Sequence, residues 1–396
     1  MLASEMYDRA SGIEDQLIRW RRAIHAHPEL GLQEHQTALL VYQTLKEAGI
    51  EVQSGLSETG VIGLIGGPGE KTVALRADMD ALPIQEETGA SYQSKISQVM
   101  HACGHDGHTA MLLGASILLK EALPQLKGNV KLIFQPAEEQ SLVGRGGARQ
   151  MVAEGVLECP PVSSIVAVHL DPDLPLGTAG IREGPLMASS TTLEILVHGK
   201  EAHGARPHQG VDSIYIAAHI VLALQGLVTR ETDALDPKLI TIGEIRGGTS
   251  PNVLSSSVLM RGVIRTLSPG MKEHVQELVA RRSQEIARAL GGDATPSFQT
   301  LYPPLVNDKG LAVLARQVCA DHPGIVRIEE LDSPRLGGED FAFYSEKVPG
   351  FMFRLGCGTP GKKRPLHSSV FDFDEKVLPI GCALMATMVC RILEER

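Results

Sequence analysis

The sequence predicts an α/β fold with a mostly parallel central sheet and helices on both faces, together with an inserted ferredoxin-like α+β domain. Two observations support this prediction. Apolar, strand-like runs alternate with helical segments in the first half of the chain, which is typical of a parallel sheet covered by helices. A later stretch follows the order β-α-β-β-α-β, which is the ferredoxin-like arrangement.

The first half of the chain begins with a helix and continues with strands. Apolar residues recur every three or four positions in residues 13–25, which predicts an amphipathic helix. Residues 71–80, 129–139 and 163–170 have the composition of buried strands, and residues 107–123 form a strong helical pattern between the first two. This alternation predicts parallel pairing of the strands.

The pattern changes after residue 186, where we expect the inserted domain to begin. Its predicted strands and helices, in order, are a strand at 191–200, a helix at 210–231, strands at 238–248 and 255–267, a helix at 270–290 and a short strand near 295–301. The inserted domain is therefore predicted at 187–299. Residues 1–186 and 300–396 form the main domain.

Composition and charge exclude several classes of protein. The 396 residues carry a net charge of −10, which argues against a nucleic-acid-binding protein with a basic face. We find no apolar stretch close to the ~20 residues of a membrane span and no signal-peptide pattern at the N-terminus. We therefore expect a cytoplasmic protein with no membrane or nucleic-acid partner. Of the six cysteines, we expect Cys103 among polar residues and the other five reduced in the core.

Side chains that can bind metal follow each of the three predicted strands. Asp78 and Asp80 end the first strand, Glu138 and Glu139 follow the second, and His169 ends the third. Open α/β sheets bind their ligands at the carboxyl ends of the strands. These side chains are therefore expected to converge.

The segment MHACGHDGHTAML adds four more donors, His101, Cys103, His105 and His108. Asp106, in the same segment, can orient an imidazole. Thiolate, imidazole and carboxylate together suit zinc, manganese, cobalt or nickel better than calcium or magnesium. Because there are more donors than one ion needs, we expect two metal ions and a spare glutamate as general base.

Eight motifs resemble, in the same order, those of the M20 metallopeptidase superfamily. They are RRAIHAHPELGLQE, ALRADMDALP, MHACGHDGH, FQPAEE, VHGKEAHGARPHQGVD, GGTSPNV, GGEDFAFY and LHSSVFDFDE. They are most similar to the amidohydrolase branch, which hydrolyses hippurate, indole-acetyl amino acids and N-acyl amino acids. The resemblance covers residues from about 15 to 375. It implies a metal-dependent catalytic domain and an inserted domain that serves as lid and dimerisation domain.

The resemblance also implies which residues bind the metal. It identifies Cys103, His105, Glu139, His169 and His367 as ligands of two divalent ions per subunit, with Cys103 as the bridge. In other branches of the superfamily an aspartate bridges the ions. A bridging cysteine would make this centre sensitive to oxidation.

Five further residues match positions of known role in the superfamily. Glu138 matches the catalytic glutamate, and Asp80 matches the aspartate that orients a metal-binding histidine. His203 matches a histidine that, in relatives, reaches the neighbouring subunit's active site and stabilises the oxyanion. Asn252 and Arg265 match positions that hold the free carboxylate of the substrate.

The resemblance therefore implies hydrolysis of the amide bond of N-acyl amino acids, such as N-acetyl or N-benzoyl derivatives, by a homodimer or homotetramer. Two alternatives remain open. One is a carboxypeptidase or dipeptidase of the same superfamily, acting on short peptides. The other, a non-catalytic metal- or ligand-binding protein, is disfavoured because a binding protein has no use for Glu138 as a base.

Overall fold

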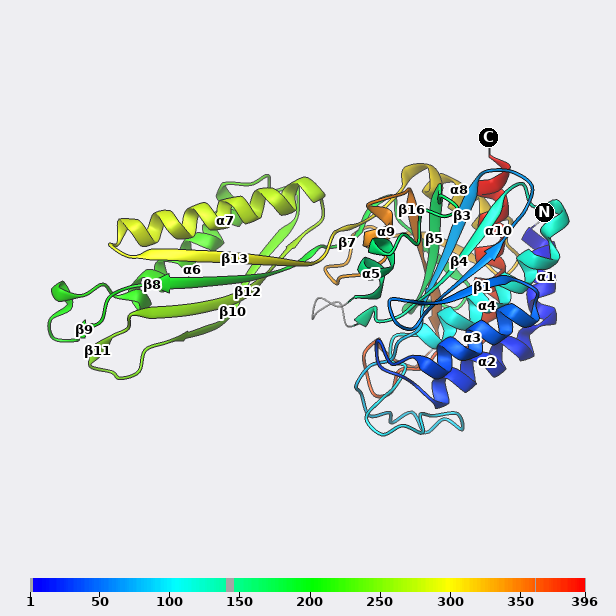
Figure 1. Cartoon of the computed structure of the whole chain (residues 1–396), viewed down its shortest axis with the longest axis horizontal. Helices are drawn as coiled ribbons and strands as arrows, with labels where there is room; N and C mark the ends of the chain where they lie inside the picture. Colours follow the sequence, from blue (N-terminus) through cyan, green and yellow to red (C-terminus); the bar gives the residue numbers. More distant parts are fainter. Residues whose placement is uncertain (1–2, 140–145, 360, 396) are drawn as a thin grey trace. The chain divides into compact units, whose positions relative to one another are not determined.

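The computed structural model describes residues 3–139, 146–359 and 361–395, and the chain divides into two compact units (Figure 1). Unit 1 comprises Met1–Gly184, Val306–Ser333 and Asp340–Arg396, and unit 2 comprises Pro185–Leu305 and Pro334–Glu339. The sequence analysis puts the inserted domain at 187–299. Unit 2 extends a few residues further at both ends and also includes the short segment Pro334–Glu339.

Unit 1 is built on an eight-stranded sheet in the order β1-β2-β4-β3-β5-β16-β6-β15. The four central strands β4, β3, β5 and β16 pair in parallel, and antiparallel pairs lie to either side of them. The predicted mostly parallel central sheet is therefore confirmed. The strands are β1 (Glu51–Leu56), β2 (Gly60–Ile65), β3 (Thr72–Asp78), β4 (Asn129–Gln135), β5 (Ser164–Pro175), β6 (Thr178–Ile181), β15 (Arg327–Glu330) and β16 (Gly350–Gly358).

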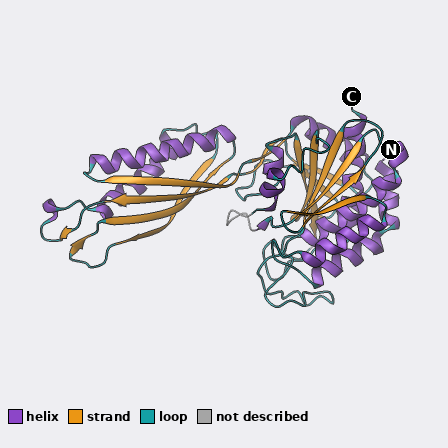
Figure 2. Cartoon of the chain, in the orientation of Figure 1, coloured by secondary structure: helices purple, strands orange, loops and turns teal. Residues whose placement is uncertain are grey.

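Helices lie on both sides of this sheet (Figures 1 and 2). The larger layer contains α1 (Ala3–Gly12), α2 (Glu14–Ala26), α3 (His35–Glu47), α4 (His105–Glu121) and α10 (Val377–Glu394). The short helices α5 (Gly147–Ala153) and α9 (Ala342–Ser345) lie on the opposite side, and unit 1 also contains α8 (Lys309–Asp321) and the 3-10 turn η1 (Leu123–Gln125). Gly114 of α4 allows close helix packing, because a Cβ there would lie 2.5 Å from the Leu17 side chain and 2.8 Å from the Cys382 sulfur.

Helix α10 is the central core helix of unit 1, and the sequence analysis does not predict it. By length and composition alone, α10 and α6 (Ser213–Arg230) could each cross a membrane. The expectation that no apolar stretch approaches that length is therefore wrong. In α10, 89% of the apolar window is buried inside the protein, against 33% in α6. Burial among α4, α1 and the sheet explains the apolar composition of α10.

Unit 2 is a four-stranded antiparallel sheet with two helices and a hydrophobic core of its own. Its elements follow the predicted order: β8 (Ser190–His198), α6, β10 (Lys238–Gly247), β12 (Ser257–Thr266), α7 (Pro269–Ala289) and β13 (Asp293–Tyr302). The spatial order of the strands is β10-β12-β8-β13. A short ribbon of β9 (Ala202–His203) and β11 (Val253–Leu254), the turn η3 (Pro207–Gln209), and strands β7 (Gly184–Met187) and β14 (Leu305–Asn307) at the chain crossings complete the set.

All six cysteines are free thiols. Five of them, Cys103 included, are buried, but Cys159 is exposed. The expectation that Cys159 is a core residue is therefore wrong. It lies in the irregular segment between α5 and β5, and such connections run over the protein surface.

Candidate metal centre

Six of the predicted site side chains meet in unit 1. The donor atoms of Cys103, His105 and His169 lie within 4.8 Å of one another. The same holds for Cys103, Glu139 and His367, and for His105, Glu138 and Glu139. Cys103 belongs to two of these three groups and His105 and Glu139 also to two, so the groups form one continuous cluster.

The turn before α4 brings Cys103 and His105 into this cluster. Gly104, between them, has a φ of +90°, which glycine adopts without the steric cost of a side chain. Asp80 fixes the His105 ring, since its backbone carbonyl and its carboxylate lie 2.9 and 3.2 Å from Nδ1. Nδ1 therefore donates to Asp80. Burial lowers the pKa of His105, but the charges of Asp78 and Cys103 outweigh it and hold that pKa well above its usual value, so a metal ion at Nε2 would displace a proton.

His169, on β5, is oriented in the same manner. Its Nδ1 donates to the carbonyl of Leu170 at 2.7 Å, and its Nε2 lies 3.6 Å from the Cys103 sulfur. Burial, then Arg354 and His108, hold the pKa of His169 well below its usual value. The ring is therefore neutral, which is the form that binds metal.

Glu139 and His367 close the other side of the cluster. Glu139 Oε1 lies 3.0 Å from His367 Nε2, and the Glu139 backbone N–H donates to Asp80 Oδ2 at 2.9 Å. The His367 backbone has a φ of +60°, and its N–H donates to the carbonyl of Ala102 at 2.8 Å. Asp80 thus orients His105 with one oxygen and holds the backbone of Glu139 with the other.

The donor set fits divalent metal ions. Among the described residues, His105 Nε2 is buried and makes no hydrogen bond, and Glu139 Oε1 is buried with the His367 ring as its ion-pair partner at 3.0 Å. Burial, then the Glu139 carboxylate, raise the pKa of the Cys103 thiol to about 12. A nearby cation would favour the thiolate, because it offsets both effects.

Buried charged side chains around Asp78 hold the metal-binding histidines in place. Asp78 accepts from His108 Nδ1 at 2.6 Å and from Arg76 at 2.7 Å, and its Oδ2 lies 3.6 Å from His105 Nε2. Arg76 also donates to Asp340 at 2.8 Å. Asp78, the last residue of β3, therefore connects His105 and His108 to the sheet. Asp340 belongs to the same network, and the sequence analysis does not single it out.

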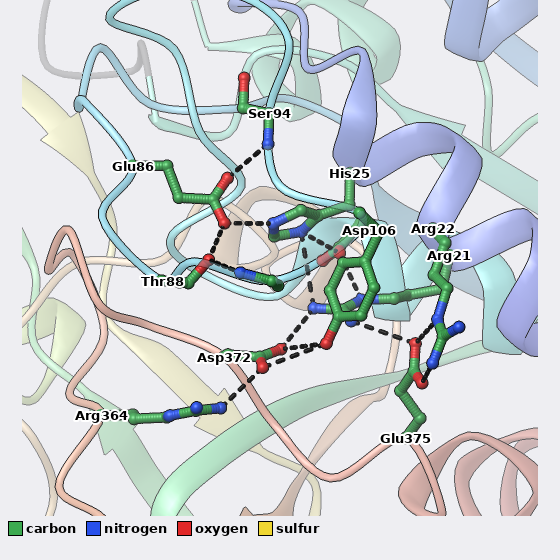
Figure 3. A network of polar contacts seen from close by, with 12 residues as sticks. Arg21, Arg22, His25, Glu86, Thr88, Ser94, Asp106, Arg364, Asp372 and Glu375 are labelled. Atoms are coloured by element: carbon green, nitrogen blue, oxygen red, sulfur yellow. Dashed lines mark hydrogen bonds and ion pairs between the residues drawn. The ribbon is translucent and has the colours of Figure 1, made fainter.

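Asp106 does not orient any of the predicted ligands. Its Oδ2 lies 2.8 Å from Nδ1 of His25 and accepts from Arg21 at 2.8 Å (Figure 3). Asp106 therefore orients an imidazole, as expected, but this imidazole is that of His25. Asp106 lies in the first turn of α4 and faces α2, whereas His105 faces the cluster.

Arg21 connects this loop to the C-terminal part of unit 1. Besides Asp106, it donates to Asp372 at 2.8 Å and to Glu375 at 3.1 Å (Figure 3). Asp372 follows His367 by five residues. One buried guanidinium therefore joins the segment that carries Cys103 and His105 to the segment that carries His367.

The remaining predicted residues, His203, Asn252 and Arg265, belong to unit 2. His203 is exposed on β9, and its Nδ1 accepts from the backbone N–H of Ala205 at 3.0 Å, so Nε2 carries the proton and is free to donate. Asn252 is also exposed, and its Oδ1 accepts from Ser250 at 2.6 Å. Pairing of β9 with β11 brings these two residues to the same ribbon.

Arg265 lies on β12 of the four-stranded sheet, at the end away from the β9–β11 ribbon. In β12, Ser257 pairs with His198 at one end and Ile264 with Thr191 at the other. Asn252 lies before the first pair and Arg265 after the second, so about 23 Å of strand separates them, at ~3.3 Å per residue. One copy of unit 2 therefore cannot bring Asn252 and Arg265 to the same small carboxylate.

The Arg265 guanidinium is suited to an anionic partner. It is about half-buried, and burial lowers its pKa, with Tyr302 acting in the opposite direction. Its Nη1 is buried and makes no hydrogen bond within the described part of the chain. A buried, unpaired guanidinium nitrogen favours binding of a carboxylate or another anion.

The sequence and the fold both have counterparts among known proteins. The profile described as "Peptidase family M20/M25/M40" matches residues 74–391, most of the chain. The chain belongs to the M20 peptidase family. The N-acetylcysteine deacetylase of Bacillus subtilis is 39% identical to this M20 protein, over 98% of this chain and 99% of that one. Thermostable carboxypeptidase 1 of Saccharolobus solfataricus is 38% identical, over 98% of both.

A solved M20 structure has the same fold. The YXEP protein of Bacillus subtilis, described as a dinuclear metal-binding peptidase, is 36% identical to this M20 protein. It superposes with a TM-score of 0.84 over 98% of this chain and 99% of that one. Together with the donor cluster, this membership identifies the protein as a metal-dependent amidohydrolase whose site suits two divalent ions.

Proposed function

We propose that this enzyme hydrolyses the amide bond of N-acyl amino acids and releases the free amino acid and a carboxylic acid. The observation that supports this most is the buried Glu138, which lies within 4.8 Å of the donor atoms of His105 and Glu139. A carboxylate beside a metal-ligand cluster is suited to act as general base. The similarity to a deacetylase and to a carboxypeptidase supports a linear amide as the substrate.

In this proposal Cys103, His105, Glu139, His169 and His367 would hold two divalent ions, which would be zinc, manganese, cobalt or nickel. When bound, the ions would act as Lewis acids and lower the pKa of a water molecule toward neutrality. The combination of thiolate, imidazole and carboxylate donors favours these metals over calcium and magnesium.

Glu138 then moves the proton. It accepts a proton from the water as the water oxygen attacks the carbonyl carbon of the substrate. It returns that proton to the amide nitrogen as the C–N bond breaks, so the amine leaves neutral. Asp80 supports both steps, because it holds the backbone of Glu139 at 2.9 Å and the ring of His105.

His203, Asn252 and Arg265 bind the rest of the substrate in this proposal. The exposed Nε2–H of His203 donates to the oxyanion, and Arg265 binds the free carboxylate. Asn252 lies on the ribbon of His203, about 23 Å of strand away from Arg265. We therefore propose that His203 and Asn252 serve the site of a second copy of the chain.

Exposed apolar side chains on unit 2 support a homodimer. On α6, Ile214, Tyr215 and Leu222 are 49%, 53% and 73% exposed. Leu239 and Ile245, on the edge strand β10, are also exposed. An apolar helix face beside an open strand edge is typical of a surface that pairs with another chain. A homotetramer built from such dimers and the cytoplasmic location both stay predictions.

The first test measures amino-acid release from a panel of N-acyl amino acids and dipeptides. Chelated enzyme is reconstituted separately with zinc, manganese, cobalt or nickel, and Glu138→Gln is assayed beside it. We expect metal-dependent turnover, preference for acyl amino acids, and a loss of at least ~10²-fold in kcat for the variant with metal still bound. Preference for dipeptides would instead support a peptidase. Unchanged turnover by Glu138→Gln would contradict the proposed base.

The second test mixes two inactive variants, His203→Ala and Glu138→Ala. If His203 serves the neighbouring site, a mixed dimer contains one intact site, formed by Glu138 of one copy and His203 of the other. Unfolding and refolding an equal mixture should then restore roughly a quarter of wild-type activity, since half of the dimers are mixed and half of their sites are intact. No recovery, with mixed dimers present, would show that His203 acts within its own chain or not at all.

A further inference from the structure

Glu34 is a buried glutamate for which the proposed mechanism gives no role. It belongs to the motif RRAIHAHPELGLQE, and its side chain is 0% exposed. It precedes α3, yet its carboxylate makes no hydrogen bond to that helix, so helix capping does not explain it. Instead, it accepts from the Thr59 hydroxyl at 2.6 Å and from the backbone N–H of Ala137 at 2.8 Å.

Ala137 has an unusual backbone conformation. Its φ is +53°, in the left-handed region that residues with a side chain rarely adopt. It is fully buried and comes directly before Glu138. Because a left-handed residue reverses the local direction of the chain, this conformation turns the segment after β4 toward the metal cluster. Such strain persists only where neighbouring groups hold it.

Two acidic side chains hold this turn from opposite ends. Glu34 binds the N–H of Ala137, before Glu138, and Asp80 binds the N–H of Glu139, after it, at 2.9 Å. The carbonyl of Ala137 also accepts from Gly147 at 3.2 Å. The backbone around Glu138 is therefore fixed on both sides, and Glu138 itself lies in a bend after β4.

Burial of Glu34 without a cationic partner has a cost that a purely structural role would not require. Burial, then the charge of Asp80, raise the pKa of Glu34 to about 7. An apolar side chain of similar size would fill the same space without that cost. The hydrogen bond to Ala137 is what an apolar side chain could not supply.

We propose that Glu34 is a positioning residue for catalysis, which holds Ala137 in its left-handed conformation and thereby aims the carboxylate of Glu138 at the substrate. This inference rests on the proposed role of Glu138 as general base. In this proposal Glu34 sets the position of Glu138, and Asp80 sets the position of Glu139.

The test compares variants of the metal-loaded enzyme, with metal content, kcat and KM measured for each. Glu34→Leu should lower kcat by roughly 10²-fold, the usual cost of displacing a catalytic group by about 1 Å. KM and metal content should change less than about threefold, because Asp80 still holds Glu139. Glu34→Gln keeps an oxygen that can accept from Ala137 and should recover at least ~10-fold of the lost kcat.

The decisive variant is Ala137→Gly combined with Glu34→Leu. Glycine adopts the left-handed conformation without steric cost, so the double variant should regain at least ~10-fold in kcat over Glu34→Leu alone. The matched control is Glu29→Leu. Glu29 lies in the same motif and binds the backbone of Gln36 and Thr37 at the start of α3, so its loss perturbs the same segment without touching Ala137.

Each outcome either supports or overturns the proposal. Equal losses of kcat in Glu34→Leu and Glu29→Leu, or no recovery from Ala137→Gly, would mean that Glu34 only stabilises the fold. Wild-type kcat in Glu34→Leu would overturn it directly. Glu138→Gln in the same series separates the two claims: an active Glu138→Gln refutes the general base, whereas an inactive one beside an active Glu34→Leu refutes only the positioning role.

Discussion

Two adjacent arginines on α2 allow a controlled test of what buried charge contributes to unit 1. Arg21 is fully buried and donates to Asp106, Asp372 and Glu375 at 2.8 to 3.1 Å. Arg22 is 45% exposed and pairs with the same Glu375. The perturbation is replacement of each in turn by methionine, which keeps most of the apolar volume and removes the charge.

The burial of the partners determines the expected magnitude. In Arg21→Met, Asp106, which is 0% exposed, loses its guanidinium partner, whereas Asp372, which is 9% exposed, keeps Arg364 at 2.6 Å. Removing one partner of a buried ion pair costs about 3–5 kcal/mol, whereas an exposed pair contributes about 0–1 kcal/mol. The free energy of unfolding should therefore fall by at least about 3 kcal/mol in Arg21→Met and by less than about 1 kcal/mol in Arg22→Met.

Urea unfolding followed by tryptophan fluorescence measures this difference in the stability of unit 1. Trp20 is the only tryptophan in the sequence, and it lies on α2 beside both arginines. Its fluorescence therefore follows the unfolding of unit 1. Equal losses in the two variants would refute the reasoning, because burial would then make no difference to the value of the charge.

The effect of Arg21→Met should also depend on pH. Burial raises the pKa of Asp106, but Arg21 and then His25 outweigh it and hold that pKa far below its usual value. A carboxylate with a lowered pKa stabilises the fold above its unfolded pKa of ~3.9, and this stabilisation is lost as the pH falls. The gap between wild type and Arg21→Met should therefore be large at pH 7 and shrink below about pH 4.

Three further predictions concern single positions. The raised pKa of Glu34, about 7 against 4.5, means that its contribution to stability is present below pH 4.5 and lost as the pH rises through 7. In chelated protein, the free energy of unfolding of Glu34→Gln should therefore rise by up to about 3 kcal/mol relative to wild type between pH 4.5 and 8, at ~1.36 kcal/mol per pKa unit. Urea unfolding at the two pH values measures this change, and the same difference between variant and wild type at both pH values would contradict the prediction. Gly107→Ala should cost about 1–3 kcal/mol, since a Cβ there would lie 2.7 Å from the Phe373 ring, whereas Gly12→Ala, with open space around it, should not destabilise the protein in the same thermal melts. Cys103→Asp should keep metal binding and part of the activity but lose sensitivity to peroxide, and equal inactivation of both forms by peroxide would show that oxidation acts elsewhere.

The sequence by itself determined the main features of the centre. Asp80, Glu138 and Glu139 could be expected at one place because they directly follow apolar strands, and parallel strands end at the same edge of a sheet. The density of donors in one short segment indicated a metal-binding loop, and the resemblance to the M20 family singled out Cys103 and His105 as its ligands. In each case the information is local: a hydrophobic pattern sets the strand, and the position along the strand sets the location of the side chain.

Tertiary structure decided the features that depend on contacts distant in sequence. Arg21 meets Asp372 and Glu375 across more than 350 residues, and Asp106 meets His25 rather than a neighbouring histidine. The separation of Asn252 from Arg265 follows from strand register, and the turn at Ala137 follows from its bond to Glu34. No local pattern encodes these pairings, because each depends on how separate elements pack and which buried polar groups then have to satisfy one another.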